Sequence, residues 1–215
     1  MPTAIKQDPS REDYFLIEKT VNNWTEYKKT KPDLSVLYQS TDKPIAVLGA
    51  GASLPDDLKK LPKDCIKISC NHHAMKIVAC DYMAFLDPVD SNHSQDFKDV
   101  VRVGKVPRIS VWNLQYTDYY CVNEDPWHQA SDTGRFATWL ACYITSGDVL
   151  LCGMNLRLQG EKNHFYDSDD DVSTWGGSPL PTKLKQWGEV FERCYNPERV
   201  KAVSGLLVDL FGKYE

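Results

Sequence analysis

From Pro44 onward, short apolar segments alternate with longer amphipathic ones, and this alternation constrains the fold of the chain more than any other feature. Many of the short segments are apolar throughout rather than at every second position, which is typical of strands that helices cover on both faces. Alternating strands and helices predict an α/β fold, a doubly wound and mostly parallel sheet. We expect strands at Ile45–Leu48, Cys65–Cys70, Tyr82–Leu86, Arg108–Trp112, Val149–Cys152 and Val200–Val203. We expect helices at Pro55–Leu61, Ser94–Val103, Thr133–Ile144, Thr182–Cys194 and Leu206–Lys213.

The residues before this alternation predict an N-terminal helical arm. Ser10, followed by Asp13, is a variant of the capping box that begins many helices. Apolar residues then recur at helical spacing from Tyr14 to Trp24, and a linker-like stretch follows. We therefore divide the chain into a helix with its linker, residues 1–43, and a single Rossmann-like nucleotide-binding domain, residues 44–215.

Composition and charge exclude several classes of protein. With 215 residues, of which 42% are hydrophobic, the chain can bury one core as a single domain. A net charge of −5 without long basic blocks disfavours sequence-independent nucleic-acid binding. No apolar run is long enough to span a membrane, and the N-terminus lacks the apolar core of a signal peptide. Seven cysteines without a C-x-x-C pair indicate reduced thiols rather than a zinc site, so we expect a cytoplasmic protein.

Glycine and polar residues follow the predicted strands, where open α/β sheets bind their ligands. Gly49 and Gly51 follow the first strand and let a ligand approach the backbone, and Ser53 can donate to a phosphate oxygen. The amides that come next open a helix, whose dipole favours an anion. Asn71 and Asp87 follow the second and third strands. The glycine loop matches neither the dinucleotide pattern nor the P-loop, so the loop alone does not identify its ligand.

A second helix start lies farther along the chain. Thr133 and Gly134 open an apolar helix, so the first amides of this helix offer another contact for an anion or a ribose. That helix leads directly into a strand that ends at Gly153, with Asn155 close behind. We predict that the two helix starts are neighbours in space and jointly hold a phosphate group.

Several stretches between Pro44 and Tyr166, taken in order, resemble a known family. They are "GAGASL…LP…CN", "FLDP" and "DTGRFATWLACYITSGDVLLCGMNLRLQGEKNHFY". Together they resemble motifs of the bacterial CMP-sialic-acid-dependent sialyltransferases and of their small bacterial and phage relatives. The resemblance implies a modified Rossmann, sialyltransferase-like domain that binds a nucleotide or nucleotide-sugar. It also suggests a phage protein that works in the host cytoplasm.

The resemblance implies a role for each residue at the strand ends and helix starts. Gly49, Gly51 and Ser53 would face the phosphates, and Asn71 and Asp87 would line the nucleotide site. Thr133 and Gly134 would contact the phosphate or sugar, and Gly153 and Asn155 would hold the ribose or base.

The chain departs from the family at several positions. Ala50 replaces an asparagine of the glycine loop, and Asn155 replaces an acid after the fifth strand. Arg157 and Asn163 stand where the family has tyrosines that stabilise the leaving phosphate. The family's C-terminal lid and its catalytic histidine are not recognisable. We therefore extend the expected donor from CMP-sialic acid to CMP- or UDP-sugars in general.

Inverting glycosyl transfer needs a base for the acceptor hydroxyl and charge stabilisation for the leaving phosphate. His164, in a polar loop after a predicted strand, is the expected base, because imidazole exchanges protons near neutral pH. Arg157 is expected to hold the phosphate charge, and Asp87 to act as an acid or base near the reacting bond. The acidic run Asp167–Asp171 is predicted to be a solvated loop, with binding of a divalent cation as the less favoured alternative, and the resembled enzymes need no metal. We expect no metal site and no required cofactor besides the nucleotide-sugar substrate.

The sequence leaves three functions open. The first is a glycosyltransferase-like enzyme that uses a nucleotide-sugar, and the second is another transferase on the same fold, such as a pyrophosphokinase. The third is a protein that binds, senses or sequesters a nucleotide derivative without catalysis. The sequence does not specify the acceptor, which could be a glycan, a nucleic acid or a metabolite. It also leaves open whether the protein forms a homo-oligomer.

The aromatic run from Trp112 to Trp127 is predicted to be a loop that stacks on a ligand or packs on the surface.

Overall fold

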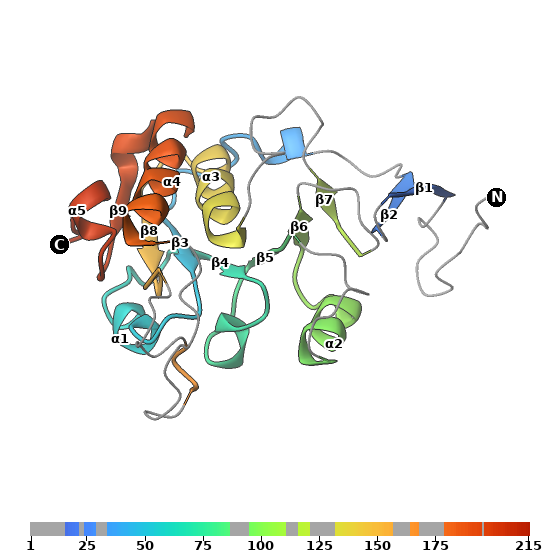
Figure 1. Ribbon diagram of the computed structural model, residues 1–215, viewed down its shortest axis with the longest axis horizontal. Helices are drawn as coiled ribbons and strands as arrows, with labels where there is room; N and C mark the ends of the chain where they lie inside the picture. The colour runs from blue at the N-terminus through green and yellow to red at the C-terminus, as the bar shows by residue number, and fades with distance from the viewer. Residues whose placement is uncertain are drawn as a thin grey trace.

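The computed structural model describes residues 16–21, 24–28, 34–86, 95–110, 116–120, 132–156, 164–167, 179–194 and 196–215. Within these ranges, seven parallel strands form one sheet in the order β7-β6-β5-β4-β3-β8-β9, with helices on both faces (Figure 1). The predicted α/β fold with a doubly wound parallel sheet is therefore confirmed.

The predicted and observed helices and strands of the sheet domain agree closely. The strands are β3 (Ile45–Leu48), β4 (Ile66–Cys70), β5 (Tyr82–Ala84), β6 (Arg108–Ser110), β7 (Tyr119–Tyr120), β8 (Val149–Cys152) and β9 (Val200–Ala202). The α-helices are α1 (Leu54–Leu58), α2 (Gln95–Val103), α3 (Thr133–Ile144), α4 (Leu180–Arg193) and α5 (Val208–Phe211). Short 3-10 helices are η1 (Leu34–Leu37), η2 (Ala74–Lys76) and η4 (Pro197–Arg199).

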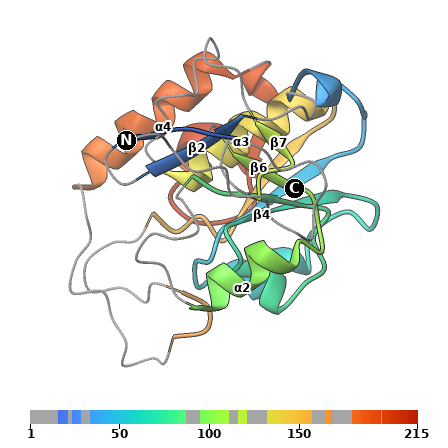
Figure 2. The ribbon, with the colours of Figure 1, turned by 90° about the vertical axis from the view of Figure 1, so that its right-hand side faces the viewer.

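Side chains alternate along β3 between two hydrophobic layers. Ile45 and Val47 pack in the same core as α3 and α4, whereas Ala46 and Leu48 pack on the opposite face with α1. Helices α3 and α4 lie on one side of the sheet, and α1 and α2 lie on the other (Figure 2). Because both faces of the strand are buried, every residue of β3 is apolar.

Helix α3 is the central helix of its layer and is apolar on almost all sides. Nine of its twelve residues are buried, and it contacts β3, β4, β8 and α4. Asp132 caps its N-terminus by accepting a hydrogen bond from the Arg135 amide at 2.8 Å. At the other end, the Arg199 guanidinium donates to the carbonyls of Thr145 at 2.8 Å and Cys142 at 3.3 Å. One side chain thus binds to each end of the helix, and at the N-terminus it uses the amide of Arg135.

The predicted N-terminal helix is wrong within the described residues. Strands β1 (Leu16–Val21) and β2 (Trp24–Lys28) form an antiparallel hairpin in a separate two-stranded sheet. Residues such as Val21 and Thr25 are β-branched, and their strand preference outweighs the helical spacing of the apolar residues. The linker after the hairpin contributes η1, which buries two leucines in the core that α3 also lines.

Strand β7 lies in the aromatic run that we predicted to be a loop. Its two residues pair with β6, and a buried ion pair fixes the segment before it. The Arg108 guanidinium of β6 donates to both carboxylate oxygens of Asp118, at 2.7 and 3.0 Å, and also donates to the Val101 carbonyl of α2. This bidentate contact joins β6, β7 and α2 through one buried arginine.

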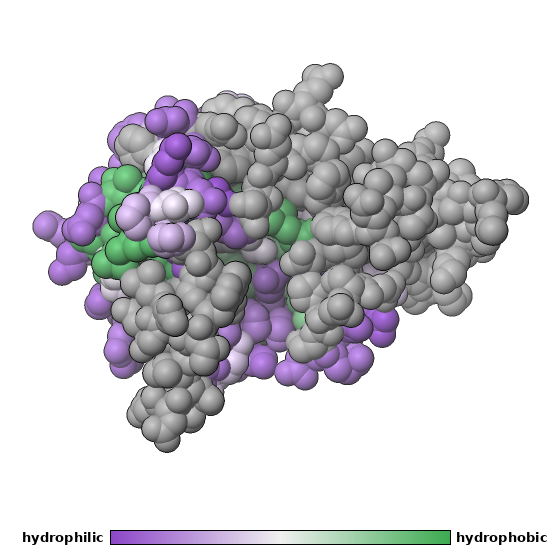
Figure 3. Space-filling model, in the orientation of Figure 1, coloured by the Kyte–Doolittle hydropathy of each residue, from purple (hydrophilic) through white to green (hydrophobic). Residues whose placement is uncertain are grey.

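The described surface in the view of Figure 3 is mainly hydrophilic, with a hydrophobic area over the C-terminal elements near β9 and α5. No helix within the described ranges is long and apolar enough to cross a membrane.

Burial raises the pKa of four cysteine thiols, those of Cys65, Cys70, Cys80 and Cys152. The raised pKa keeps these thiols protonated at neutral pH and makes them weak nucleophiles.

Candidate functional site

The carboxyl ends of β3 and β8 meet where the strand order of the sheet reverses. From β3 the sheet extends through β4, β5 and β6 to β7, and after α3 the chain returns to place β8 and β9 on the other side of β3. Open α/β sheets bind their ligands in the crevice outside such a switch point. The turns that follow these strands therefore form the candidate site.

The turns after β3 and β8 contact each other through their backbones. The amide of Gly49 donates to the Cys152 carbonyl, and that of Gly51 donates to the Gly153 carbonyl, both at 2.8 Å. A Cβ atom on Gly51 would lie 2.5 Å from the Gly153 oxygen and would also clash with the side chain of Asn155. Gly153 has a φ of +63°, in the left-handed region that favours glycine. These glycines thus permit the close approach of the two turns.

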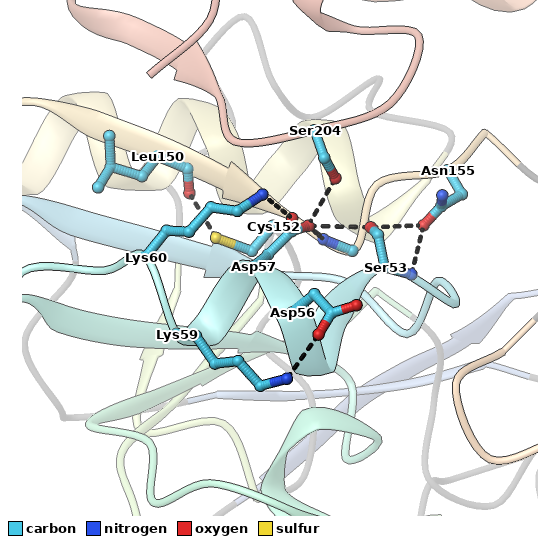
Figure 4. A network of polar contacts seen from close by, with 10 residues as sticks. Ser53, Asp56, Asp57, Lys59, Lys60, Leu150, Cys152, Asn155 and Ser204 are labelled. Carbon is cyan, nitrogen blue, oxygen red and sulfur yellow. Dashed lines mark hydrogen bonds and ion pairs between the residues drawn. The ribbon is translucent and has the colours of Figure 1, made fainter. Parts of the chain in front are cut away.

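Asp57 joins the elements around this junction (Figure 4). Its side chain lies on α1 and is buried, with 1% exposed. Oδ2 accepts hydrogen bonds from the Gly153 amide, the Ser53 hydroxyl and the Ser204 hydroxyl, each at 2.9 Å. The ammonium of Lys60 lies 3.9 Å from the other carboxylate oxygen. One carboxylate therefore connects α1 with the segments that follow β8 and β9.

Ser53, the predicted phosphate donor, contacts two protein side chains. Its hydroxyl lies 2.9 Å from Oδ2 of Asp57 and 3.0 Å from Oδ1 of Asn155, and its amide lies 3.4 Å from the same Asn155 oxygen. Because a hydroxyl has one proton, Ser53 donates to one of these oxygens at a time. A phosphate oxygen at this position would replace Asn155 as the acceptor. The five-residue α1 also supplies only a short stack of peptide dipoles.

The start of α3 lies beside the glycine loop, and the predicted proximity of these two segments is confirmed. The sulfur of Met154 would lie 2.9 Å from a Cβ atom on Gly49 and 3.4 Å from one on Gly134. Met154 therefore contacts both the first glycine of the loop and the start of α3. Thr133 approaches the end of β4, because its carbonyl oxygen lies 4.0 Å from the sulfur of Cys70.

Asn71 lies in the turn after β4 with an unusual backbone and an unsatisfied side-chain atom. Its φ is +55°, its amide donates to the Ala84 carbonyl at 2.8 Å, and its carbonyl accepts from the Ser69 hydroxyl at 2.6 Å. The side-chain oxygen Oδ1 is buried and has no hydrogen-bond partner among the described residues. A buried acceptor without a partner is destabilising, and a ligand that donates to it would remove this penalty.

His164 lies in a short turn that docks on the glycine loop. The amide of Phe165 donates to the carbonyl of Ala50 at 2.9 Å. Oδ2 of Asp167 accepts from the His164 amide at 2.9 Å and lies 3.0 Å from the ring nitrogen Nδ1. The predicted base thus lies beside the predicted phosphate loop, although the two segments are far apart in the sequence.

Aromatic rings connect this turn to the end of β4. The rings of His164 and Tyr166 stack with centroids 4.9 Å apart, and the ring of His73 lies 5.5 Å from that of His164. The Tyr166 hydroxyl lies 3.0 Å from Nδ1 of His73, and the ammonium of Lys76 lies 5.0 Å from the Tyr166 ring centroid. The end of β4, the glycine loop and the 164–167 turn therefore form one continuous rim.

Two predicted catalytic residues, Asp87 and Arg157, lie outside the described residues, and their roles stay predictions. The acidic run predicted to be a solvated loop is described only at Asp167. Among the residues with assigned positions, no group of three or more His, Cys, Asp or Glu side chains could hold a metal ion.

Three residues around the candidate site were not predicted from the sequence. Asp57 belongs to the charged segment "PDDLKK", where a solvent-exposed carboxylate is the usual expectation. Met154 carries no polar group and gives no signal of a site. Asp132 offered a recognisable signal, because an aspartate immediately before an apolar helix is typical of an N-cap.

No protein-family model and no curated protein sequence matches the chain. Two sialyltransferases are among the solved structures that are similar to it. The sialyltransferase CstII from Campylobacter jejuni, in complex with a substrate analogue, cytidine-5′-monophosphate, is 13% identical, with 80% of this chain and 85% of that chain covered and a TM-score of 0.53. A variant of the sialyltransferase CST-II in complex with CMP is 14% identical, with 81% and 87% covered and a TM-score of 0.55. At this identity the likeness concerns the fold: the chain has a sialyltransferase-like α/β fold.

Proposed function

We propose that the chain is a glycosyltransferase-like enzyme that transfers a sugar from a CMP- or UDP-sugar to an acceptor hydroxyl. One observation supports this proposal most strongly. The turns after β3, β4 and β8, the start of α3 and the turn that carries His164 converge at the switch point of the sheet. The same fold occurs in two sialyltransferase structures that contain CMP.

In this proposal the nucleotide lies across the ends of β4, β3 and β8. The amides at the start of α3 face its phosphate, because a twelve-residue helix presents a substantial positive dipole at its N-terminus. The unsatisfied oxygen of Asn71 accepts from an amino or hydroxyl group of the nucleoside. The remaining contacts come from residues that border the same crevice, namely Gly49, Gly51, Ser53, Thr133, Gly134, Gly153 and Asn155.

His164 is the proposed base. The acceptor oxygen forms a bond to the anomeric carbon of the sugar while His164 takes the hydroxyl proton. The bond between that carbon and the phosphate oxygen breaks, and the nucleotide leaves with the electron pair. Arg157 is proposed to stabilise the charge on the leaving phosphate, and Asp87 to act beside the reacting bond. This scheme needs neither a metal ion nor a further cofactor.

A second candidate function is binding or sequestering of a nucleotide derivative without catalysis. The observation that favours it is the contact of Asn155 with both the amide and the hydroxyl of Ser53. A phosphate at Ser53 would compete with this internal contact, which weakens the stabilisation that a leaving phosphate needs. A binding protein has no such requirement.

Thermal unfolding in the presence of CMP, UDP, ADP and their sugars separates these functions. Binding to one site stabilises the folded state by about 2.7 kcal/mol at a hundredfold excess of ligand over Kd. For a domain of this size, that stabilisation raises Tm by roughly 5–10 °C. A shift with release of free CMP or UDP supports the transferase, and a shift without turnover supports the binding protein.

Two variants make the measurement specific to the rim. Asn71→Ala removes the unsatisfied acceptor and is expected to reduce the Tm shift that the nucleotide produces. Asp64→Ala removes an exposed carboxylate before the amino end of β4, at the opposite edge of the sheet, and should leave the shift unchanged. Absence of a shift with every nucleotide and nucleotide-sugar would contradict both candidate functions.

A further inference from the structure

We infer that Asp167 is a positioning residue that holds the ring of His164 in the tautomer protonated at Nδ1, so that Nε2 is the basic atom. The inference rests on the proposed function for the role of His164 as the base. It adds the residue that orients this base and the ring nitrogen that receives the proton.

The hydrogen bonds between the two residues determine the tautomer. Oδ2 of Asp167 accepts from the His164 backbone amide at 2.9 Å, and a backbone amide is always a donor. The same oxygen lies 3.0 Å from Nδ1 of the ring. An ionised carboxylate accepts hydrogen bonds and donates none, so the proton between Nδ1 and Oδ2 belongs to the ring. In a neutral imidazole this leaves the lone pair on Nε2.

The turn restrains both partners. The Asp167 amide donates back to the His164 carbonyl at 3.2 Å, so three hydrogen bonds join the two residues. Both side chains are largely shielded from water, with 21% of His164 and 17% of Asp167 exposed. A carboxylate held in this way keeps its position when the ring gains or loses a proton.

Neighbouring groups fix the ring relative to the proposed nucleotide site. The Tyr166 ring lies nearly parallel to that of His164, at an interplanar angle of 5°. The His73 ring also stacks on that of His164. The Phe165 amide donates to the Ala50 carbonyl, which anchors the turn on the glycine loop. A half-turn of the imidazole would break the contact with Asp167, and smaller rotations would also disturb the stacking, so these contacts hold the ring in one orientation.

This arrangement suits a general base. A free imidazole exchanges between two tautomers, and only the form protonated at Nδ1 can accept a proton at Nε2. When Nε2 takes the proton of the acceptor hydroxyl, the ring becomes positively charged, and the adjacent carboxylate stabilises that charge. Asp167 therefore orients the base before the reaction and stabilises it afterwards, without contact with the substrate.

Nitrogen NMR of histidine-labelled protein tests the tautomer without any substrate. On the high-pH plateau of its nitrogen chemical shifts, where the ring is neutral, His164 should be protonated at Nδ1 and not at Nε2. Its signals are assigned by their loss in His164→Gln. Asp167→Ala should convert His164 mainly to the tautomer protonated at Nε2. Asp167→Asn should retain the wild-type tautomer, because the His164 backbone amide still orients an amide oxygen toward the ring. Asp64→Ala serves as the control, and circular dichroism verifies that each variant is folded.

Each outcome bears on either the positioning role or the enzymatic one. A wild-type ring protonated at Nε2, or an unchanged tautomer in Asp167→Ala, would overturn the positioning role whatever the activity. The expected tautomers without nucleotide binding would support the positioning of the ring and refute the proposed function. With an active donor, Asp167→Ala should lower kcat about 10–100-fold with little change in KM, because the base acts after binding. An unchanged kcat in that variant would also overturn the role.

Discussion

Replacement of Asp57 by alanine should strongly destabilise the folded protein. The side chain is 1% exposed, and three donors lie 2.9 Å from its Oδ2. Alanine leaves the buried Gly153 amide without an acceptor, which costs about 1–3 kcal/mol. The hydroxyls of Ser53 and Ser204 also lose a charged partner, although they can rotate toward other acceptors. We expect the free energy of unfolding to fall by about 3–5 kcal/mol, because the unsatisfied amide adds to two lost hydrogen bonds to a charged group.

Two further variants separate the carboxylate from its surroundings. Asp57→Asn keeps the size and one acceptor oxygen but loses the charge, so we expect a smaller loss of about 1–2 kcal/mol. Asp56 is the neighbouring aspartate on α1, and its contact with Lys59, at 2.6 Å, joins two exposed side chains. Exposed ion pairs contribute little to stability, so Asp56→Ala should unfold at the same urea concentration as the wild type.

Urea denaturation followed by tryptophan fluorescence and circular dichroism measures these differences. A lower midpoint with an unchanged m-value would show that the folded state itself has lost stability. The reasoning is refuted if Asp57→Ala is as stable as Asp56→Ala, since the carboxylate would then not hold the junction of β3, β8 and β9.

Three other predictions, the first with a control variant on α4, concern the stability of the fold and are checked by thermal or urea unfolding. Gly51→Ala should destabilise the protein by several kcal/mol, roughly as overpacking against a fixed backbone does, because its Cβ would lie 2.5 Å from the Gly153 oxygen. Gly188→Ala on α4 places a Cβ atom that meets no described residue within 4 Å and should be neutral or slightly stabilising. Asp132→Ala should lower stability by about 1–2 kcal/mol through loss of the α3 cap, and Asp132→Asn should retain most of it. Burial raises the pKa of Cys80 from 9.0 to about 12, so the folded state binds more protons than the unfolded state between these values. Stability should therefore fall as the pH rises above 9, with a shallower decline in Cys80→Ser.

The sheet domain was predictable because its signals are local. The residues of β3 and β8 are apolar throughout, and α3 is bounded by an aspartate cap and a continuous buried run, so these elements were predicted with the observed bounds. The N-terminal hairpin was missed because the same apolar residues fit both one face of a helix and two strands. Only the pairing between the two strands distinguishes these structures, and a local sequence pattern does not show it. Strand β7 was missed because two residues carry no periodicity and depend on Arg108 and Asp118 for their position.

The candidate site was predictable in location but not in the division of roles within it. The rule that ligands lie beyond strand ends selected Gly49, Asn71 and Gly153 from the sequence, and the helix-start signal selected Gly134. It did not distinguish a glycine that faces a ligand from one that packs on another turn, because this difference depends on Asn155 and Met154, which approach from across the junction.

The two sides of the candidate site use their polar groups differently, although each keeps one buried side-chain oxygen without a hydrogen bond among the described residues, Oδ1 of Asp57 and Oδ1 of Asn71. Oδ1 of Asp57 lies 3.9 Å from the ammonium of Lys60. At the ends of β3, β8 and β9, Asp57 gathers the available donors, and the Ser53 amide and hydroxyl contact Asn155. At the end of β4, the buried oxygen of Asn71 has no hydrogen-bond partner among the described residues, and His73 of the same turn contacts the stacked rings of His164 and Tyr166. Ligand recognition should therefore depend first on the β4 side, with the glycine loop acting mainly as its support. On this reasoning, Asn71→Ala should weaken nucleotide binding more than it weakens folding, whereas Asp57→Ala should weaken folding first.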